Sequence, residues 1–138
     1  MLLHIVARGR IGRGPEADLV SRYLERIAWP TKLTELSPKD TEPAADKAIV
    51  VRLDEKGESL SSAELAGWLE SWRDQGRREA RFLIGGADGF SAAARERSDL
   101  LLSFGRATWP HLLVRAMLAE QLFRATSLIA GHPYHRAG

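Results

Sequence analysis

Residues 81–90 read Arg-Phe-Leu-Ile-Gly-Gly-Ala-Asp-Gly-Phe, an apolar run that passes directly into a glycine-rich stretch. The run predicts a buried strand, and glycines directly after a strand allow a ligand to approach the backbone closely. The glycine spacing is G-G-x-x-G, which differs from the dinucleotide pattern G-x-G-x-x-G, and the chain has no P-loop pattern. Alone, this motif leaves two alternatives open, a ligand-binding loop and a simple strand-to-helix turn.

Strand and helix patterns alternate on both sides of this stretch. Short apolar runs predict strands over residues 2–8, 32–37, 48–53, 81–84 and 100–104. Apolar periodicity and helix punctuation predict helices over residues 15–28, 61–76, 91–97 and 111–130. Such alternation is typical of an α/β fold with a mostly parallel sheet. The length of 138 residues is that of one ordinary domain.

Local signals support two of these helices and one loop. Pro15 suits the first residue of a helix, and Ser61 with Glu64 forms a capping box. Residues 38–46 are rich in turn-forming residues and predict an exposed loop. In the helix after the capping box, one apolar face is expected to contain Leu65, Trp68, Leu69 and Trp72.

Three predicted loops follow strands at one edge of the sheet, after Leu53, Ile84 and Phe104. Ligands of parallel sheets bind at the carboxyl ends of the strands, so these loops are where we expect a site. In the first loop, Asp54 could bind a hydroxyl or a positive group, or belong to a charged surface turn. In the third, the backbone of residues 104–111 could bind an adenine edge, or simply connect a strand to a helix.

The predicted helix over residues 111–130 is apolar nearly all round. A helix of this kind is buried on most sides, and in so small a chain it indicates a subunit interface. Glu120 and Arg124 are four residues apart, which predicts a structural ion pair.

The last seven residues gather unusual chemistry, with His132, Tyr134, His135 and Arg136 within five positions. These side chains can transfer protons, stack on a base and bind phosphate. A chain terminus is more often featureless, which is the alternative. His132 and His135 could form a metal pair, but tight zinc sites take three or four protein ligands. We therefore expect no metal.

Composition excludes several classes of protein. The chain has no cysteine, which rules out a disulfide framework, a thiolate nucleophile and cysteine-ligated zinc. No apolar run approaches the roughly 20 residues that span a membrane, so a cytoplasmic protein without membrane segments is expected. The net charge is +2 with a pI of about 9.3, and 16 of the 20 basic residues are Arg. Arginine suits phosphate and base recognition, although genomic base composition would give the same bias.

Four stretches carry a resemblance to a known family. In chain order they are Leu-Asp-x-x-Gly at 53–57, Phe-Leu-Ile-Gly-Gly-x-x-Gly at 82–89, Thr-x-Pro-His-x-x-x-Arg at 108–115 and His-Pro-Tyr-His-Arg at 132–136. Together they resemble the RlmH-type rRNA methyltransferases of the SPOUT superfamily. The resemblance covers nearly the whole chain, except that residues 38–47 look shortened relative to the family.

This resemblance implies a single SPOUT domain over residues 1–138, an α/β fold with helices on both faces of the sheet and a deep C-terminal trefoil knot. It also implies a homodimer that binds S-adenosyl-L-methionine in the knot. The cofactor-binding positions carried over by motif are Leu53, Gly85, Phe104, Gly105, Arg106, Ala107, Thr108 and Trp109.

The implied reaction is methylation of N3 of pseudouridine 1915 in 23S rRNA, on the assembled ribosome. The N3 proton must leave, and His135 and His132 are candidate bases. Tyr134 would stack or donate a hydrogen bond, and Arg136 would stabilise charge. Three alternatives are a SPOUT methyltransferase for another RNA, a non-catalytic RNA-binding or ribosome-assembly factor, and a nucleotide-dependent enzyme that uses the glycine loop. The missing nucleotide fingerprints oppose the last alternative.

Overall fold

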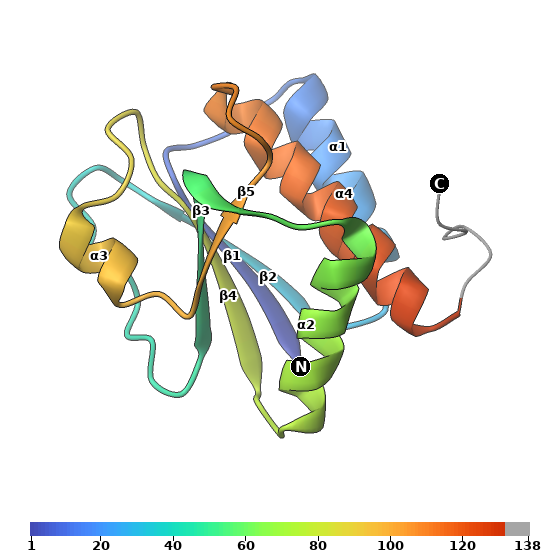
Figure 1. Ribbon diagram of the computed structural model, residues 1–138. Coiled ribbons are helices and arrows are strands. Elements are labelled where there is room, and N and C mark those ends of the chain that lie inside the picture. The colour runs from blue at the N-terminus through green and yellow to red at the C-terminus, as the bar shows by residue number, and fades with distance from the viewer. Residues whose placement is uncertain (132–138) are drawn as a thin grey trace.

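A five-stranded sheet forms the centre of the computed structural model, which describes residues 1–131 (Figure 1). In chain order the elements are β1 (Leu2–Arg8), α1 (Pro15–Arg26), β2 (Thr31–Leu36), β3 (Ile49–Ser59), α2 (Ser62–Asp74), β4 (Glu79–Ile84), α3 (Ala92–Glu96), β5 (Leu100–Ser103) and α4 (His111–Ile129). The predicted alternation is confirmed, and only the end of β3 lies more than two residues from its expected position.

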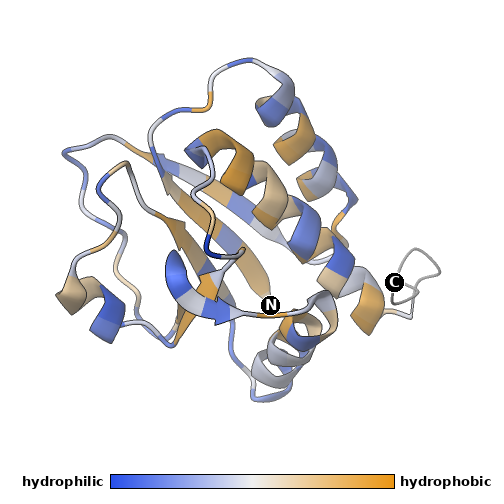
Figure 2. Ribbon diagram, turned by 45° about the horizontal axis from the view of Figure 1, so that its top comes forward, coloured by the Kyte–Doolittle hydropathy of each residue, from blue (hydrophilic) through white to orange (hydrophobic). Residues whose placement is uncertain are grey.

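The strands lie in the order β2-β1-β4-β3-β5, and every neighbouring pair is parallel. Both central strands, β1 and β4, are almost entirely buried, which explains why their sequences are nearly continuous apolar runs. Figure 2 shows hydrophobic residues along the inner strands and hydrophilic residues in the loops around them. All five strands end at the same edge, so the loops that follow them are neighbours in space.

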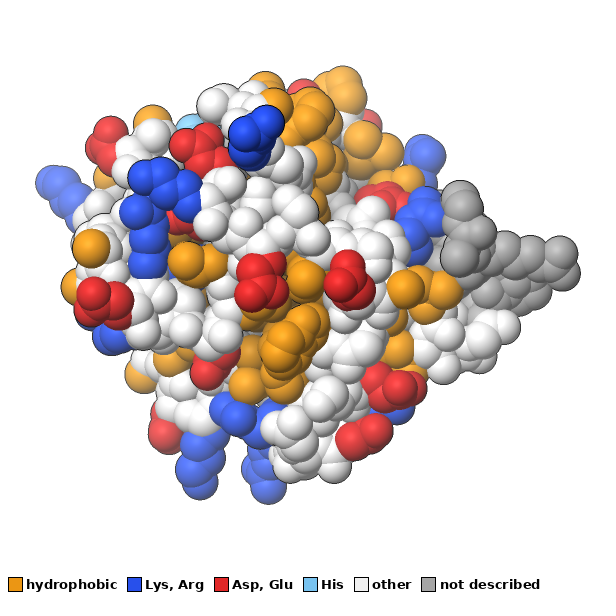
Figure 3. Space-filling view, viewed as in Figure 1, with side chains coloured by type: hydrophobic (Ala, Val, Ile, Leu, Met, Phe, Trp, Pro, Cys, Tyr) orange, Lys and Arg blue, Asp and Glu red, His pale blue; other side chains and the backbone are white. Residues whose placement is uncertain are grey.

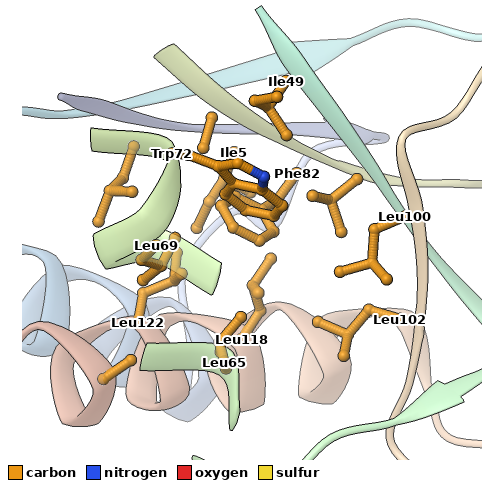
Figure 4. Packing of buried hydrophobic residues seen from close by; sticks show 14 of the residues in the cluster. Ile5, Ile49, Leu65, Leu69, Trp72, Phe82, Leu100, Leu102, Leu118 and Leu122 are labelled. Carbon is orange, nitrogen blue, oxygen red and sulfur yellow. The ribbon is translucent and has the colours of Figure 1, made fainter. Parts of the chain in front are cut away.

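The main core lies between one face of the sheet and the helices α1, α2 and α4 (Figures 1 and 4). Ile5, Val51 and Phe82 alternate with residues of the other face, and they meet Leu69 and Leu118 from the helices. Each of these five side chains is buried. Burial of a large apolar side chain contributes about 1.5–3 kcal/mol, so this layer dominates the stability of the fold.

The opposite face is covered more thinly, by α3 and residues 38–47 (Figure 1). Two buried arginines of the sheet hold this cover in place. Arg52 binds the Glu42 carboxylate with two hydrogen bonds of 2.7 and 2.9 Å. Arg81 donates to the carbonyls of Pro43 and Ala44, both at 2.9 Å. Residues 38–47 contain no helix or strand, as predicted, but they are anchored by these charge-assisted hydrogen bonds.

The capping box of α2 is confirmed, since Ser61 and Glu64 exchange side-chain to backbone hydrogen bonds of 2.8 and 3.0 Å. The predicted apolar face is only partly correct. Leu65, Leu69 and Trp72 are buried, but Trp68 is 42% exposed and rests against the Trp72 ring. Ala66 takes its place inside, because the buried stripe is rotated towards α4.

On α4, the predicted ion pair between Glu120 and Arg124 is confirmed at 2.7 Å. The helix packs against α1 and α2, and its inner residues include Leu118 and Leu122, both completely buried. Much of its apolar surface is therefore covered by the chain itself, and residues such as Met117 stay half-buried. A subunit interface on this helix remains a prediction.

Candidate cofactor site

A cavity of about 430 Å³ opens at the carboxyl edge of the sheet. All three predicted loops meet there, together with the first turn of α4. A volume of several hundred Å³ suits a drug-sized ligand. The lining residues are Leu53, Asp54, Glu55, Ile84, Gly85, Gly86, Ala87, Asp88, Gly89, Arg95, Leu102, Phe104, Gly105, Ala107, Thr108, Trp109, His111 and Val114.

The first wall is an irregularity in β3. Leu53 and Glu58 both lie opposite Leu102 of β5, so residues 54–57 bulge out of the ladder. The prediction that the strand ends at Leu53 is therefore wrong, because pairing with β5 resumes beyond the bulge. Gly57 allows this return, since a Cβ there would lie 2.6 Å from the carbonyl carbon of Leu101.

Asp54, at the start of the bulge, is not part of a charged surface turn. Its side chain is 5% exposed and pairs with Arg95 of α3, with 2.7 Å between Oδ2 and Nε. Its other oxygen accepts the Lys56 N–H at 2.9 Å. Asp54 therefore fixes the bulge and α3 together, and its carboxylate already has two partners.

The second wall is the glycine loop after β4. Gly85 is crowded, because a Cβ there would lie 3.3 Å from the Gly89 carbonyl and from the Phe90 ring. Gly86 is less restricted, since its Cβ would meet only Arg8 at 3.9 Å. Gly89 has a φ of 68° and donates its N–H to the Gly86 carbonyl at 3.0 Å. The loop is a tight turn whose backbone forms the cavity surface.

The third wall is the turn over residues 104–109. Buried Ser103 organises its start: its hydroxyl accepts the Gly105 N–H at 3.0 Å and lies 3.2 Å from the Glu55 carbonyl. Gly105 adopts a φ of 109°, which favours glycine. The N–H groups of Ala107 and Thr108 donate no hydrogen bond within residues 1–131. They are free to bind a ligand.

The cavity combines apolar walls, from Leu53, Ile84 and Val114, with a rim that carries carboxylates and open backbone groups. Glu55 and Asp88 add negative charge. This combination fits a ligand that has an aromatic ring, hydrogen-bonding edges and positive charge. Groups of three or more His, Asp or Glu side chains that could hold a metal ion are absent from the described part of the chain.

A family model described as "Predicted SPOUT methyltransferase" matches residues 1–135. The chain belongs to the SPOUT methyltransferase family. Similar proteins include the ribosomal RNA large subunit methyltransferase H of Rhizorhabdus wittichii, 66% identical with all of both chains covered. The protein of the same name from Sphingopyxis alaskensis is 61% identical, covering 100% of this chain and 99% of the other. The chain groups with these proteins inside the SPOUT family.

A solved structure supports the SPOUT fold independently of sequence. It is "a probable methylase family protein" from Haemophilus influenzae Rd KW20, with a TM-score of 0.62 at 9% identity. The match covers 99% of this chain and 70% of that one. At this identity the likeness shows the fold alone. The trefoil knot expected of SPOUT proteins remains a prediction.

The structure brings together seven of the eight positions predicted to bind the cofactor. Leu53, Gly85 and the turn residues Phe104, Gly105, Ala107, Thr108 and Trp109 all line the cavity of this SPOUT protein. Arg106 is exposed and is not among the lining residues. Sequence reasoning missed Arg95, because its partner Asp54 lies 41 residues away in the chain, and Ser103, because a serine at the end of a strand gives no distinctive signal.

The proposed catalytic residues His132, Tyr134, His135 and Arg136 lie outside the described residues. Their roles therefore stay predictions. The described chain ends at Gly131, whose φ of 72° terminates α4 as expected.

Proposed function

We propose that this chain is an S-adenosyl-L-methionine-dependent methyltransferase that methylates N3 of pseudouridine 1915 of 23S rRNA on the assembled ribosome, in the cytoplasm. The observation that carries the proposal is the meeting of three family motifs, at residues 53–57, 82–89 and 108–115, around one cavity. Full-length relatives named ribosomal RNA large subunit methyltransferase H support the rRNA substrate.

The cavity fits the cofactor on physical grounds. The open N–H groups of Ala107 and Thr108 can bind acceptor atoms of an adenine, and Leu53 and Val114 offer apolar surface to its ring. Glu55 and Asp88 suit the positive charges of the amino and sulfonium groups. The absence of a side chain at Gly85 lets the glycine loop fold tightly against Gly89 and Phe90 at the cavity wall.

S-adenosyl-L-methionine, when bound, supplies an electrophilic methyl group. The chain must hold the acceptor N3 in line with that methyl, and positioning of this kind can supply roughly 7–11 kcal/mol of the barrier reduction. The residues of the cavity would hold S-adenosyl-L-methionine, whose methyl group would exchange its bond to sulfur for a bond to N3. His135 or His132 accepts the N3 proton, while Tyr134 and Arg136 hold the base and its charge.

Two measurements test the proposal directly. Mass mapping of 23S rRNA from cells that lack the gene should show a mass loss of one methyl group at pseudouridine 1915, restored by the cloned gene. Calorimetry should show that the purified protein binds S-adenosyl-L-methionine. A protein that binds no methyl donor would support the binding-factor alternative, and a methyl lost from a different nucleotide would refute the assigned position.

A further inference from the structure

The loop between β1 and α1, residues 9–14, carries two arginines, of which Arg10 interacts electrostatically with Glu35. Arg10 and Arg13 are both exposed, and neither makes a hydrogen bond or ion pair within residues 1–131. Gly9 and Gly12, with φ of 90° and 65°, set the path of the backbone between them. We call residues 9–14 the arginine loop.

An ion pair between buried Arg115 and the more exposed Glu35 anchors the arginine loop. Arg115 of α4 is 1% exposed, and its Nη1 binds Glu35 of β2 at 2.5 Å. Its Nη2 donates to the Gly9 carbonyl at 3.2 Å. Glu35 also accepts the Ile11 N–H at 2.8 Å. Both ends of this pair therefore hold the loop backbone, which links it to a strand and to the helix of the cofactor site.

The environment of Glu35 keeps this anchor charged. Partial burial raises the pKa of Glu35, but the hydrogen bond from Ile11 and the guanidinium of Arg115 outweigh burial and leave the pKa below its usual value. An ionised Glu35 accepts stronger hydrogen bonds than a neutral one would. The loop is thus fixed near neutral pH.

The arginine loop follows the strand next to β4, whose glycine loop lines the cavity. β1 and β4 are neighbours with Ala7 opposite Ile84, so the loop leaves the sheet beside Gly85 and Gly86. The first turn of α4 lines the cavity at His111 and Val114, and Arg115 follows directly. The anchor of the loop and the wall of the cofactor cavity are consecutive residues of one helix.

Most other arginines near this edge are already engaged. Arg8 donates to the carbonyls of Ser37 and Asp40, and Arg95 pairs with Asp54. Arg106 is exposed, but it belongs to the turn that forms the cofactor site. Arg10 and Arg13 combine exposed guanidinium groups that make no hydrogen bond or ion pair within residues 1–131, an anchored backbone and a position in the loop next to the glycine loop.

We propose that Arg10 and Arg13 bind phosphates of the substrate RNA strand next to the target nucleotide, and that the Arg115–Glu35 pair positions them. This inference rests on the proposed function. Arginine binds phosphate with two parallel hydrogen bonds, and phosphate contacts set the register of a protein on a nucleic acid without reading its sequence. A pre-fixed loop loses less entropy on binding than a mobile one.

The test compares the double variant Arg10→Gln/Arg13→Gln with Lys47→Gln/Arg78→Gln. The control removes the same charge from exposed residues at the opposite, amino edge of the sheet. Ribosome methylation is measured against ribosome concentration at several salt concentrations, and cofactor affinity by calorimetry. In the arginine-loop variant we expect KM for ribosomes to rise about tenfold, with cofactor affinity unchanged. In the same variant, the slope of log KM against log salt concentration should decrease by about 1.5, because two phosphate contacts are lost.

A third variant, Glu35→Gln, tests positioning. It keeps both loop arginines, so KM should rise while the salt slope stays that of the wild type. An arginine-loop variant with wild-type KM, or a control variant with an equal rise, would overturn the phosphate site. A wild-type protein that binds the cofactor but leaves ribosomes unmodified would instead refute the proposed function, and the inference with it.

Discussion

At the scale of single residues, Gly85 and Gly86 are neighbours in sequence but meet different surroundings. A Cβ at Gly85 would press on the Gly89 carbonyl and the Phe90 ring at 3.3 Å, whereas one at Gly86 would meet Arg8 at 3.9 Å, an ordinary contact. Neither residue has a positive φ, so alanine is tolerated by the backbone at both. Substitutions at these two glycines therefore distinguish the effect of the tight packing at Gly85 from the effect of simply replacing a glycine in the loop.

Gly85→Ala should weaken S-adenosyl-L-methionine binding by about tenfold or more, because the loop must shift by a few tenths of an ångström to accept the methyl group. Gly86→Ala should change affinity less than about threefold. Calorimetry on both folded variants measures the difference, in which each 1.4 kcal/mol corresponds to a factor of ten. Equal affinities for the two variants would remove Gly85 from the cofactor site.

Glu42 gives the fold a defined dependence on pH. The hydrogen bonds from Arg52 hold the pKa of Glu42 below its usual value, although burial opposes them. A carboxyl whose folded pKa is lowered contributes stability that is present above its unfolded pKa, near 4.5, and is lost as pH falls through the folded pKa.

Glu42→Gln should therefore lower the free energy of unfolding by about 2 kcal/mol at pH 7. The gap in unfolding free energy between wild type and variant should shrink as pH falls below about 4.5, where Glu42 of the unfolded chain takes up its proton, and should vanish below the lower pKa of the folded state. Urea unfolding at a series of pH values measures both effects. Glu25→Gln, on the exposed side of α1, is the control and should show neither. A difference in unfolding free energy that stays constant down to pH 3 would contradict the pairing of Glu42 with Arg52.

At the scale of elements, the bulge in β3 is what shapes the site. The strand leaves the ladder after Leu53 and rejoins it at Glu58, so one strand supplies both a cofactor wall and the approach to α2. At Gly57 the two strands come so close that a Cβ atom would lie 2.6 Å from the backbone of Leu101 in β5. Gly67, on the exposed side of α2, has open space around it.

Two glycine substitutions should therefore have opposite signs. Gly57→Ala should destabilise the protein by about 1–3 kcal/mol, because the added methyl group must push β3 from β5. Gly67→Ala should stabilise it by about 0.5–1 kcal/mol, since alanine is the better helix former. Thermal and urea unfolding measure both, and cofactor affinity should fall only for Gly57→Ala. A neutral Gly57→Ala would mean that the bulge is pliable.

At the scale of the whole molecule, the homodimer remains a prediction, and its test depends on the surface of α1 and α4. In Figure 3, hydrophobic side chains reach the surface at the upper right, where Figure 1 draws α1 and α4. Among the described residues, no helix is both long and apolar enough to cross a membrane. The half-buried apolar residues of α4, Met117 among them, are candidates for burial against a second subunit.

Met117→Glu should convert a dimer to a folded monomer, because a charge buried at an interface lacks a partner there. Sedimentation gives the mass, and circular dichroism checks that the helices persist. Leu118→Glu is the contrasting variant: Leu118 is completely buried within the chain itself, so its charge should unfold the protein. A wild-type monomer at micromolar concentration would refute the dimer.

Removal of residues 132–138 should separate cofactor binding from catalysis. The loops after Leu53, Ile84 and Phe104 form the cavity walls among the described residues, so we expect S-adenosyl-L-methionine affinity to stay near the wild-type value. Methylation of ribosomes should fall at least about a hundredfold if the tail supplies the base. Mixing the truncated chain with a Gly85→Val chain tests whether the tail of one subunit serves the other. Wild-type rates from the truncated enzyme would exclude His132, Tyr134, His135 and Arg136 from catalysis.

The sequence by itself determined the order of strands and helices and the three strand-end loops, because each depends on apolar spacing, caps and glycines within a dozen residues. Its motifs also predicted eight cofactor-binding positions, seven of which line one cavity in the structure. Only the tertiary structure decided the strand order β2-β1-β4-β3-β5, the return of β3 to the sheet beyond Leu53, the exposure of Trp68 and the burial of Arg115. These features depend on partners far apart in the chain, such as Glu35 for Arg115 and Asp54 for Arg95. Local periodicity cannot encode such pairs, because they form only when the strands assemble and bring distant side chains to one edge.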